Sequence, residues 1–354
     1  MIANEKTLLL AVLLAALFYF IEHTVLHAGQ GASWLAFAVL FAVIVATSMR
    51  VAAHAEVLAH RLGEPYGTMI LTFSAVVVEV LMLVIIMMNS DAPTLARDTV
   101  YAAVMIDING ILGLAALIGG IRHGEQKYNL DSSNAYIAML FVAIGIAMFV
   151  PEFIPAQSWK AYSVFTVLIV FVLYAAFLRI QTVEHRGFFE YRYEDEEADE
   201  EHGGRSTLYH VVALVFSVVM IGILAEFLAA FLEAGMRGSD LPLAIPAVMV
   251  AVVSASPEIL TALRAALADR MQTVINIALG ASLATVLLTI PVIEGVALLT
   301  GQRIEMALTP LQTAMTVLTL LTALINLHDG QTNVLEGIVH FALFMTFVAL
   351  VFLA

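Results

Sequence analysis

Two glutamates lie inside long apolar stretches of the sequence, one in each half of the chain. Glu79 has apolar neighbours on both sides for several turns, and Glu258 follows Pro257 in the apolar stretch 241–291. An ionised carboxylate near the centre of a lipid bilayer costs about 3 kcal/mol on insertion scales, so such residues are usually kept for a function. Two carboxylates can neutralise a divalent cation, and each can also bind a proton. The pair therefore predicts a site for cations and protons.

Neutral oxygen atoms near these glutamates are the expected further ligands. Hard cations such as Ca²⁺ take about six to eight oxygen ligands, which hydroxyls, amides and backbone carbonyls supply together with carboxylates. Ser254 lies one helical turn before Glu258, and the candidates in the neighbouring stretches are Asn109, Asn276, Ser282 and Thr285. The alternative for each hydroxyl is a hydrogen bond to its own helix. Pro257 has no N–H, which leaves the Val253 carbonyl without its helical donor and able to face the site.

The composition predicts a polytopic membrane protein. Of the 354 residues, 62% are hydrophobic and only 12% are charged, and the longest polar stretch, 182–206, is too short for a soluble domain. Cysteine is absent, which excludes disulfides and thiolate metal ligands. The formal net charge of −14 disfavours nucleic acid as a partner and favours cations. The expected small partners are therefore cations, and the expected surroundings are membrane lipid.

Eleven apolar stretches are long enough to cross about 30 Å of hydrocarbon as helices, so the predicted fold is all-α. They lie near residues 7–27, 33–60, 66–90, 98–120, 133–151, 160–180, 207–235, 241–266, 271–299, 306–327 and 335–354.

The lysines and arginines predict the orientation in the membrane. Eleven of the fifteen lie at the N-terminus or in the loops on the same side as it. Because basic residues concentrate on the cytoplasmic side, we expect a cytoplasmic N-terminus and an external C-terminus. The segment 182–206 is then a cytoplasmic acidic loop. Its run of acids, Glu194 to Glu201, is either a self-repelling linker or a sensor of cytosolic cations.

An internal repeat divides the chain. The octet Ala55–Leu62 reads like Ala225–Leu232, and each precedes a glutamate-bearing stretch. The predicted organisation is an extra N-terminal transmembrane helix at 1–30, a first repeat at 31–181, the acidic loop at 182–206 and a second repeat at 207–354. With five spans in each repeat, the second copy enters the membrane upside down, an inverted five-plus-five arrangement. Such symmetry places Glu79 and Glu258 across a pseudo-two-fold axis near the midplane.

Both glutamate-bearing regions resemble one family. GEPYGTMILTFSAVVVEV, beginning at Gly63, is similar to the start of the first α-repeat of the calcium/cation antiporter superfamily, and PEILTALRAALADRMQTVINIALGASLATVLLTIP, from Pro257 to Pro291, is similar to its second α-repeat. The α-repeats correspond here to residues 63–120 and 241–291. The resemblance is to the bacterial sodium/calcium–proton antiporters of the ChaA type, and it covers most of the chain.

The resemblance implies exchange of Ca²⁺ or Na⁺ for H⁺ across the bacterial cytoplasmic membrane, without a cofactor. Glu79 and Glu258 match the cation-binding acids of the α-repeats, and Asn109 matches the asparagine of the first. In the second α-repeat, Ala-Leu-Gly-Ala-Ser stands where the family has Ala-Leu-Gly-Ser-Ala, which puts the ligand role of Ser282 in doubt. Asp107 is an acid that the family pattern does not contain.

Other polar residues are weaker candidates. Asp107, Glu56 and Glu226 are candidates for the ion path or for proton coupling. Glu56 and Glu226 occupy matching positions in the two octets, near the ends of their spans. Glu294 is expected at the membrane interface, where a solvated carboxylate costs little.

These observations predict a secondary transporter that exchanges cytosolic Ca²⁺, Na⁺ or K⁺ for H⁺ by alternating access. A cation channel is the main alternative, but channels usually place acidic rings around a pore in an oligomer, and an inverted pair in one chain favours alternating access. A membrane enzyme is a third class, and the chain carries no familiar catalytic motif. We also expect that the chain can form a homo-oligomer.

Overall fold

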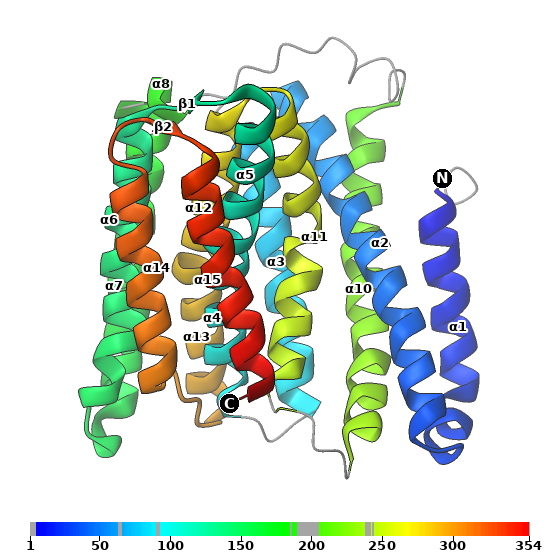
Figure 1. The fold of residues 1–354 in the computed structure, drawn as a ribbon. Coiled ribbons are helices and arrows are strands. Elements are labelled where there is room, and N and C mark those ends of the chain that lie inside the picture. Colours follow the sequence, from blue (N-terminus) through cyan, green and yellow to red (C-terminus); the bar gives the residue numbers. More distant parts are fainter. Residues whose placement is uncertain are drawn as a thin grey trace. The chain divides into compact units, whose positions relative to one another are not determined.

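The computed structural model describes residues 5–62, 66–89, 93–184, 186–189, 205–237, 242 and 244–353. Nearly all of these residues are helical (Figure 1). The predicted acidic run from Glu194 to Glu201 lies outside the described residues. Its role as a linker or sensor therefore stays a prediction.

The chain forms two compact units, and each draws on both halves of the sequence. Unit 1 comprises residues 1–92 and 192–257, and unit 2 comprises residues 93–191 and 258–354. The chain passes from unit 1 to unit 2 between Pro257 and Glu258, inside helix α11 (Ile245–Leu267). The predicted repeats at 31–181 and 207–354 divide the chain differently from these units, because they are based on internal symmetry. That symmetry stays a prediction.

Unit 1 is built around the packing of helix α10 on helix α2. Its helices are α1 (Lys6–His27), α2 (Gln30–Leu62), α3 (Tyr66–Asn89), α10 (Thr207–Met236) and the part of α11 that ends at Pro257. Helix α3 packs on α2 and α10, and α1 packs on the same two helices. The Phe18 ring of α1 lies 5.2 Å from the Phe231 ring of α10, centroid to centroid.

Unit 2 holds the remaining elements, which pack around two long interrupted helices. Its elements are α4 (Leu95–Val104), η2 (Met105–Ile111), α5 (Leu112–His123), β1 (Gln126–Lys127), α6 (Leu130–Ile144), η3 (Gly145–Phe149), η4 (Val150–Phe153), η5 (Ala156–Ser158), α7 (Trp159–Arg179), η6 (Ile180–Glu184), α8 (Arg186–Phe189), the end of α11, α12 (Met271–Ala284), η7 (Thr285–Thr289), α13 (Ile290–Thr300), α14 (Pro310–Asn326), β2 (Gln331–Thr332) and α15 (Val334–Leu353). Strands β1 and β2 form a short antiparallel pair (Figure 1).

Among the described residues, nine helices are long and apolar enough to cross a membrane. The segments 73–88 and 310–326 are shorter apolar helices, and they fall in two of the stretches predicted to be spans. The chain is thus a mostly helical, polytopic membrane protein. The count of eleven spans stays a prediction.

Two of the nine helices are much more buried than the others, and both contain a π-helical segment. The helix 95–123 is 72% buried and the helix 271–300 is 67% buried within its most apolar window. The first consists of α4, η2 and α5, and the second of α12, η7 and α13. A π-helical turn inserts an extra residue into a helix and is frequent at functional sites. These two helices carry Asp107, Asn109, Ser282 and Thr285, so these four candidates lie in the interior of unit 2.

Helices α5 and α15 approach each other closely because glycines line their contact (Figure 1). A Cβ atom added at Gly113 would lie 2.8 Å from the backbone nitrogen of Phe341, and one added at Gly337 would overlap the backbone of Leu117. Small residues allow such close approach between membrane helices, where van der Waals packing drives association. The α5–α15 contact therefore depends on the absence of side chains at these positions.

We expect Gly337→Ala to lower the stability of the protein, whereas Gly295→Ala in α13 should not. A helical glycine replaced by alanine normally gains about 0.5–1 kcal/mol from backbone entropy, and a Cβ at Gly295 meets no atom within 4 Å. At Gly337 the clash should outweigh that gain by about 1–3 kcal/mol. Thermal unfolding in detergent measures both variants. Equal melting temperatures would contradict the close contact between α5 and α15.

Candidate cation site

The two predicted ligand glutamates belong to different units, so the surroundings of each are described separately. Glu79 lies in the interior part of α3 in unit 1 and is only 2% exposed. Glu258 follows Pro257 in α11, is the first residue of that stretch in unit 2, and is partly exposed. Both carboxylates therefore lie on helices, as the sequence predicts.

Two polar groups just before Pro257 in α11 form hydrogen bonds within unit 1. The Ser254 hydroxyl, which is buried, donates to the Ala251 carbonyl at 3.0 Å. This is the hydrogen bond within the helix that the sequence left open, and it still leaves the hydroxyl lone pairs available to a ligand. The Val253 carbonyl, predicted to face the site, accepts a 3.4 Å bond from Ser48 on α2. The structure thus gives that carbonyl a partner in unit 1.

Asp107 and Ser282 form a direct contact inside unit 2. The Ser282 hydroxyl on α12 donates to Oδ2 of Asp107 in η2 at 3.0 Å, and both side chains are almost completely buried. The contact joins the two interrupted helices, one from each predicted α-repeat. Two sequence candidates that are 175 positions apart are therefore brought together.

Asn109 lies in the same π-helical segment, but its amide bonds to other helices. Its Nδ2 donates to Thr319 of α14 at 2.7 Å, and its Oδ1 lies 3.0 Å from Nδ1 of His340 on α15. Asn109 is completely buried. The structure therefore places its amide in a network with α14 and α15, while Asp107 bonds to α12. A ligand role for Asn109 stays a prediction and would use a remaining lone pair of Oδ1.

Asn276 has a role in holding helices together. Its Nδ2 donates to the Phe189 carbonyl of α8 at 3.1 Å, and its Oδ1 accepts from Gln272 at 2.9 Å. Gln272 in turn donates to Ser132 of α6 at 3.1 Å. This network connects α12 to α6 and α8, so the amide of Asn276 is already used in packing.

Glu294 was expected at the membrane interface, and the structure shows that this was wrong. It lies in α13 and is only 2% exposed. Ser163 of α7 donates to its Oε1 at 3.5 Å, and Oε2 has no hydrogen-bond partner among the described residues. The apolar run Leu287 to Leu299 around it was the available signal. Packing against α7 buries the Glu294 side chain. The hydropathy of a single helix does not indicate such packing.

The remaining acidic candidates are exposed. Glu56 on α2 and Glu226 on α10 both face outward from the helices of unit 1. Glu226 is ten residues from the last residue of α10, so it is farther from the helix end than the sequence suggested. Their roles in an ion path or in proton coupling stay predictions.

The comparisons with known proteins decide the family. The model of the sodium/calcium exchanger protein family matches residues 32–183 and 209–353, which together are most of the chain. The chain belongs to the sodium/calcium exchanger protein family. The resemblance seen in the two glutamate-bearing regions is therefore confirmed, and the chain is a transporter-family protein of the membrane.

Relatives named as antiporters match between about two thirds and nearly nine tenths of the chain. It is 35% identical over 316 residues to the sodium-potassium/proton antiporter ChaA of Escherichia coli strain K12, covering 87% of this chain and 86% of that protein. It is 24% identical over 234 residues to the Ca²⁺/H⁺ antiporter ChaA of Bacillus subtilis strain 168, covering 64% and 66%. The structure of native YfkE matches the fold with a TM-score of 0.75 at 19% identity, covering 94% of this chain and 100% of that one. Family membership thus supports a transporter and not an enzyme.

We expect Thr319→Val to destabilise this exchanger-family protein. Valine has nearly the same shape as threonine but cannot accept the hydrogen bond from Asn109 Nδ2, and this buried donor would keep its contact with the Met105 sulfur at 3.6 Å. A buried donor without a good partner costs about 1–3 kcal/mol. Thr346→Val on α15 is the matched control, since Thr346 is exposed and bonds only to Ala342. Thermal unfolding compares the two, and equal effects would show that the Asn109 network adds no stability.

Proposed function

We propose that the protein is a secondary active antiporter that exchanges a cytosolic cation, Ca²⁺ or Na⁺ or K⁺, for H⁺ by alternating access. Glu79 and Glu258 bind both the cation and the proton. The observation that carries the proposal is that both acids lie in the parts of the chain matched by the exchanger-family model. The names of the Escherichia coli and Bacillus subtilis relatives, a sodium-potassium/proton and a Ca²⁺/H⁺ antiporter, support proton coupling.

Further ligands come from the polar interior of both α-repeats. Asp107 adds a third carboxylate, held by the Ser282 hydroxyl at 3.0 Å. Ser254 and Ser282 supply hydroxyl oxygens and Asn109 an amide oxygen, the oxygen ligand types that hard cations take. A proton and a cation neutralise the same carboxylates, so binding of one displaces the other. That competition is the physical basis of the exchange.

We further propose the topology that this mechanism needs. Eleven spans form an inverted five-plus-five repeat with one extra N-terminal helix, in a bacterial cytoplasmic membrane. The N-terminus is cytoplasmic and the C-terminus external, as the bias of eleven basic residues to four suggests. The acidic run after Tyr193 then faces the cytosol, where it can attract cations to the inner mouth.

Exchange, rather than channel conduction, is testable by flux in everted membrane vesicles that hold a pH-sensitive dye. Addition of Ca²⁺, Na⁺ or K⁺ in turn should release protons from the vesicles through an antiporter, with a rate that saturates. A channel would show conduction of the cation without obligatory proton counterflow.

Glu79→Gln and Glu258→Gln should each abolish cation/proton exchange in such vesicles. Each variant removes one negative charge from the site. A divalent cation that is only half neutralised is then costly, because the local dielectric is low. Glu226→Gln is the control, since it changes an exposed acid on α10 and should keep most of the exchange. Membrane insertion of all three is checked by immunoblot. Wild-type exchange by either of the first two variants would overturn the two-carboxylate site.

Cation affinity should rise with pH, because protons and cations compete for the same carboxylates. Between about pH 6 and pH 9, the cation concentration that gives half-maximal exchange should fall by about an order of magnitude or more. Asp107→Asn should move this profile toward acid, because a third negative charge in the cavity makes its neighbours hold their protons more tightly. An affinity that is constant over this pH range would exclude a shared site. An unchanged profile in Asp107→Asn would assign Asp107 to the packing of unit 2 alone.

A further inference from the structure

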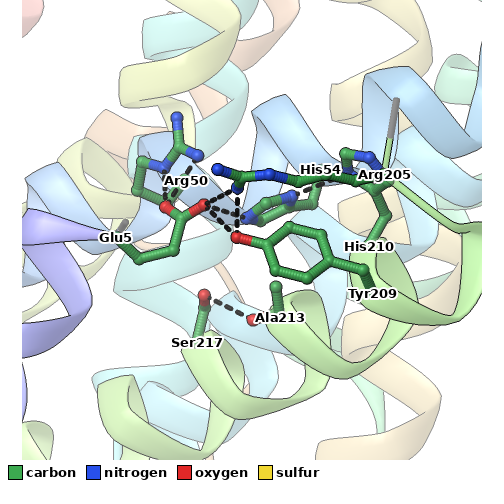
Figure 2. A network of polar contacts seen from close by, with 8 residues as sticks. All are labelled: Glu5, Arg50, His54, Arg205, Tyr209, His210, Ala213 and Ser217. Atoms are coloured by element: carbon green, nitrogen blue, oxygen red, sulfur yellow. Dashed lines mark hydrogen bonds and ion pairs between the residues drawn. The ribbon is translucent and has the colours of Figure 1, made fainter. Parts of the chain in front are cut away.

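A cluster of polar side chains around the buried residue Glu5 joins three helices of unit 1 (Figure 2). We call it the Glu5 cluster, and its members are Glu5, Arg50, His54, Arg205, Tyr209 and His210. Glu5 immediately precedes α1, while Arg50 and His54 lie on α2. Tyr209 and His210 lie in the first turn of α10. The cluster therefore ties the start of the N-terminal helix to the two helices at the centre of the unit.

Glu5 is the centre of the cluster and is only 3% exposed. Its carboxylate accepts from Arg50 at 2.8 Å and from the Tyr209 hydroxyl at 2.8 Å, and Arg205 lies at 3.4 Å. Burial alone would raise the pKa of the Glu5 carboxyl, but the Tyr209 hydrogen bond and the charges of Arg50 and His54 outweigh burial, so this pKa is lowered. Glu5 contributes stability above its ordinary pKa, and that contribution is lost only as the pH falls through the lowered value. It thus stays ionised at pH values where histidines titrate.

His54 and His210 are the two histidines of the cluster, and histidine is the residue type whose ordinary pKa lies near neutrality. Their Nδ1 atoms are 3.0 Å apart, and each side chain is only 1% exposed. Nε2 of His54 lies 3.7 Å from Oε1 of Glu5. A hydrogen bond between two ring nitrogens needs one proton between them, donated by one ring and accepted by the other. The contact is therefore compatible with two neutral rings or with one neutral and one charged ring.

The His54–His210 contact survives the first added proton and is broken by the second. The first proton makes His54 an imidazolium whose two N–H groups point to His210 and to Glu5, so the contact is kept. With both rings charged, neither Nδ1 can accept, and two positive charges face each other across 3.0 Å. Arg50 and Arg205 already carry two positive charges beside the single carboxylate of Glu5. The cluster has no further negative charge among its six residues to balance them.

Two further charged residues of α2, Arg61 and Glu56, lie in the described part of unit 1. Arg61 on α2 donates to the Arg205 carbonyl at 2.8 Å and to Thr207 at 3.2 Å, and it adds positive charge. Glu56 is exposed. Deeper in the unit, α1 is held to α10 by the apolar contact of Phe18 with Phe231. Charge repulsion would thus loosen the first turns of α1 while the middle of the helix stays packed.

We propose that the His54–His210 pair is a proton-operated latch: it holds the start of α1 against α2 and α10, and it opens when both rings are protonated in an acid cytosol. The consequence for transport rests on the proposed function. An antiporter that brings protons into the cell would be slowed when the cytosol is already acid. The latch is separate from proton competition at the cation site, because it acts on the maximal rate and not on cation affinity.

The latch can be tested on the full-length protein because the chain contains no cysteine. Leu13→Cys on α1 and Val215→Cys on α10 introduce two labelling sites at exposed positions of unit 1. Spin labels at both sites report the α1–α10 distance by pulsed electron resonance in lipid nanodiscs. At about pH 8 we expect one narrow distance distribution, and at about pH 5.5, where an ordinary histidine is roughly 90% protonated, a second and longer population.

Two histidine variants in this labelled background identify the group responsible. His210→Asn keeps a hydrogen-bonding atom near the position of Nδ1 but cannot be charged, so its distribution should stay narrow at both pH values, and His54→Asn should behave likewise. His123→Asn, at an exposed histidine of unit 2, is the matched control and should open as the wild type does. A wild-type distribution that is the same at both pH values overturns the latch. Opening of His210→Asn in acid overturns it too.

Transport in proteoliposomes at saturating cation gives an independent readout. We expect the maximal rate of the wild type to fall roughly fivefold between about pH 8 and pH 5.5 on the cytoplasmic side, and that of His210→Asn to fall less than about twofold. An equal fall in both overturns the effect on transport. Absence of exchange in every variant, with the distance change still present, would overturn the proposed function and leave the latch standing.

Discussion

The cost of placing a carboxylate in a membrane interior is the constraint on which the rest of this structure depends. Each buried acid has to be matched by a proton, a cation or hydrogen-bond donors. The protein uses different solutions in different places: Glu5 is surrounded by two arginines and a tyrosine hydroxyl, whereas Asp107 receives a serine hydroxyl. A carboxylate with fixed positive partners serves packing. One that is matched by neutral donors can still exchange a proton for a metal ion.

The π-helical segments η2 and η7 allow polar groups to be concentrated in the interior without breaking the helices. Within η2, Asp107 reaches α12 while Asn109, two residues later, reaches α14 and α15. One helix thereby organises three neighbours of unit 2 through buried hydrogen bonds, each of which is stronger in a low-dielectric interior than in water. The same network restricts the freedom of Asn109, because movement of α14 or α15 would leave its amide unpaired. The hydrogen bonds of Asp107 and Asn109 thus make the interior of unit 2 both polar and rigid.

The family, the helical fold and the burial of Glu79 could be predicted from the sequence, because hydropathy and an isolated acid are local signals. The partners of Asn109 could not, since Thr319 and His340 are 210 and 231 positions away and nothing near them marks the contact. Glu294 and Glu5 were missed for a related reason. An acid near a helix end is equally compatible with solvent and with burial, and only packing against α7 for Glu294, or against α2 and α10 for Glu5, decides between them. The π-helical segments are also invisible to a periodicity of 3.6 residues.

The number of carboxylates also bears on which cation is carried. Relatives in one family are named for sodium, potassium and calcium, so family membership alone does not select the ion. Charge balance connects the ion to the protons: Ca²⁺ matches the charge of two displaced protons, and Na⁺ or K⁺ the charge of one. In a site of low dielectric, unbalanced charge is costly, which favours exchange that keeps the net charge of the site constant. If Asp107 belongs to the proposed site, its carboxylate increases the number of protons that the site can hold. In the proposed site, selectivity among ions of equal charge would depend on the spacing of the neutral oxygens, and the contact of α12 with η2 fixes the positions of Ser282 and Asp107.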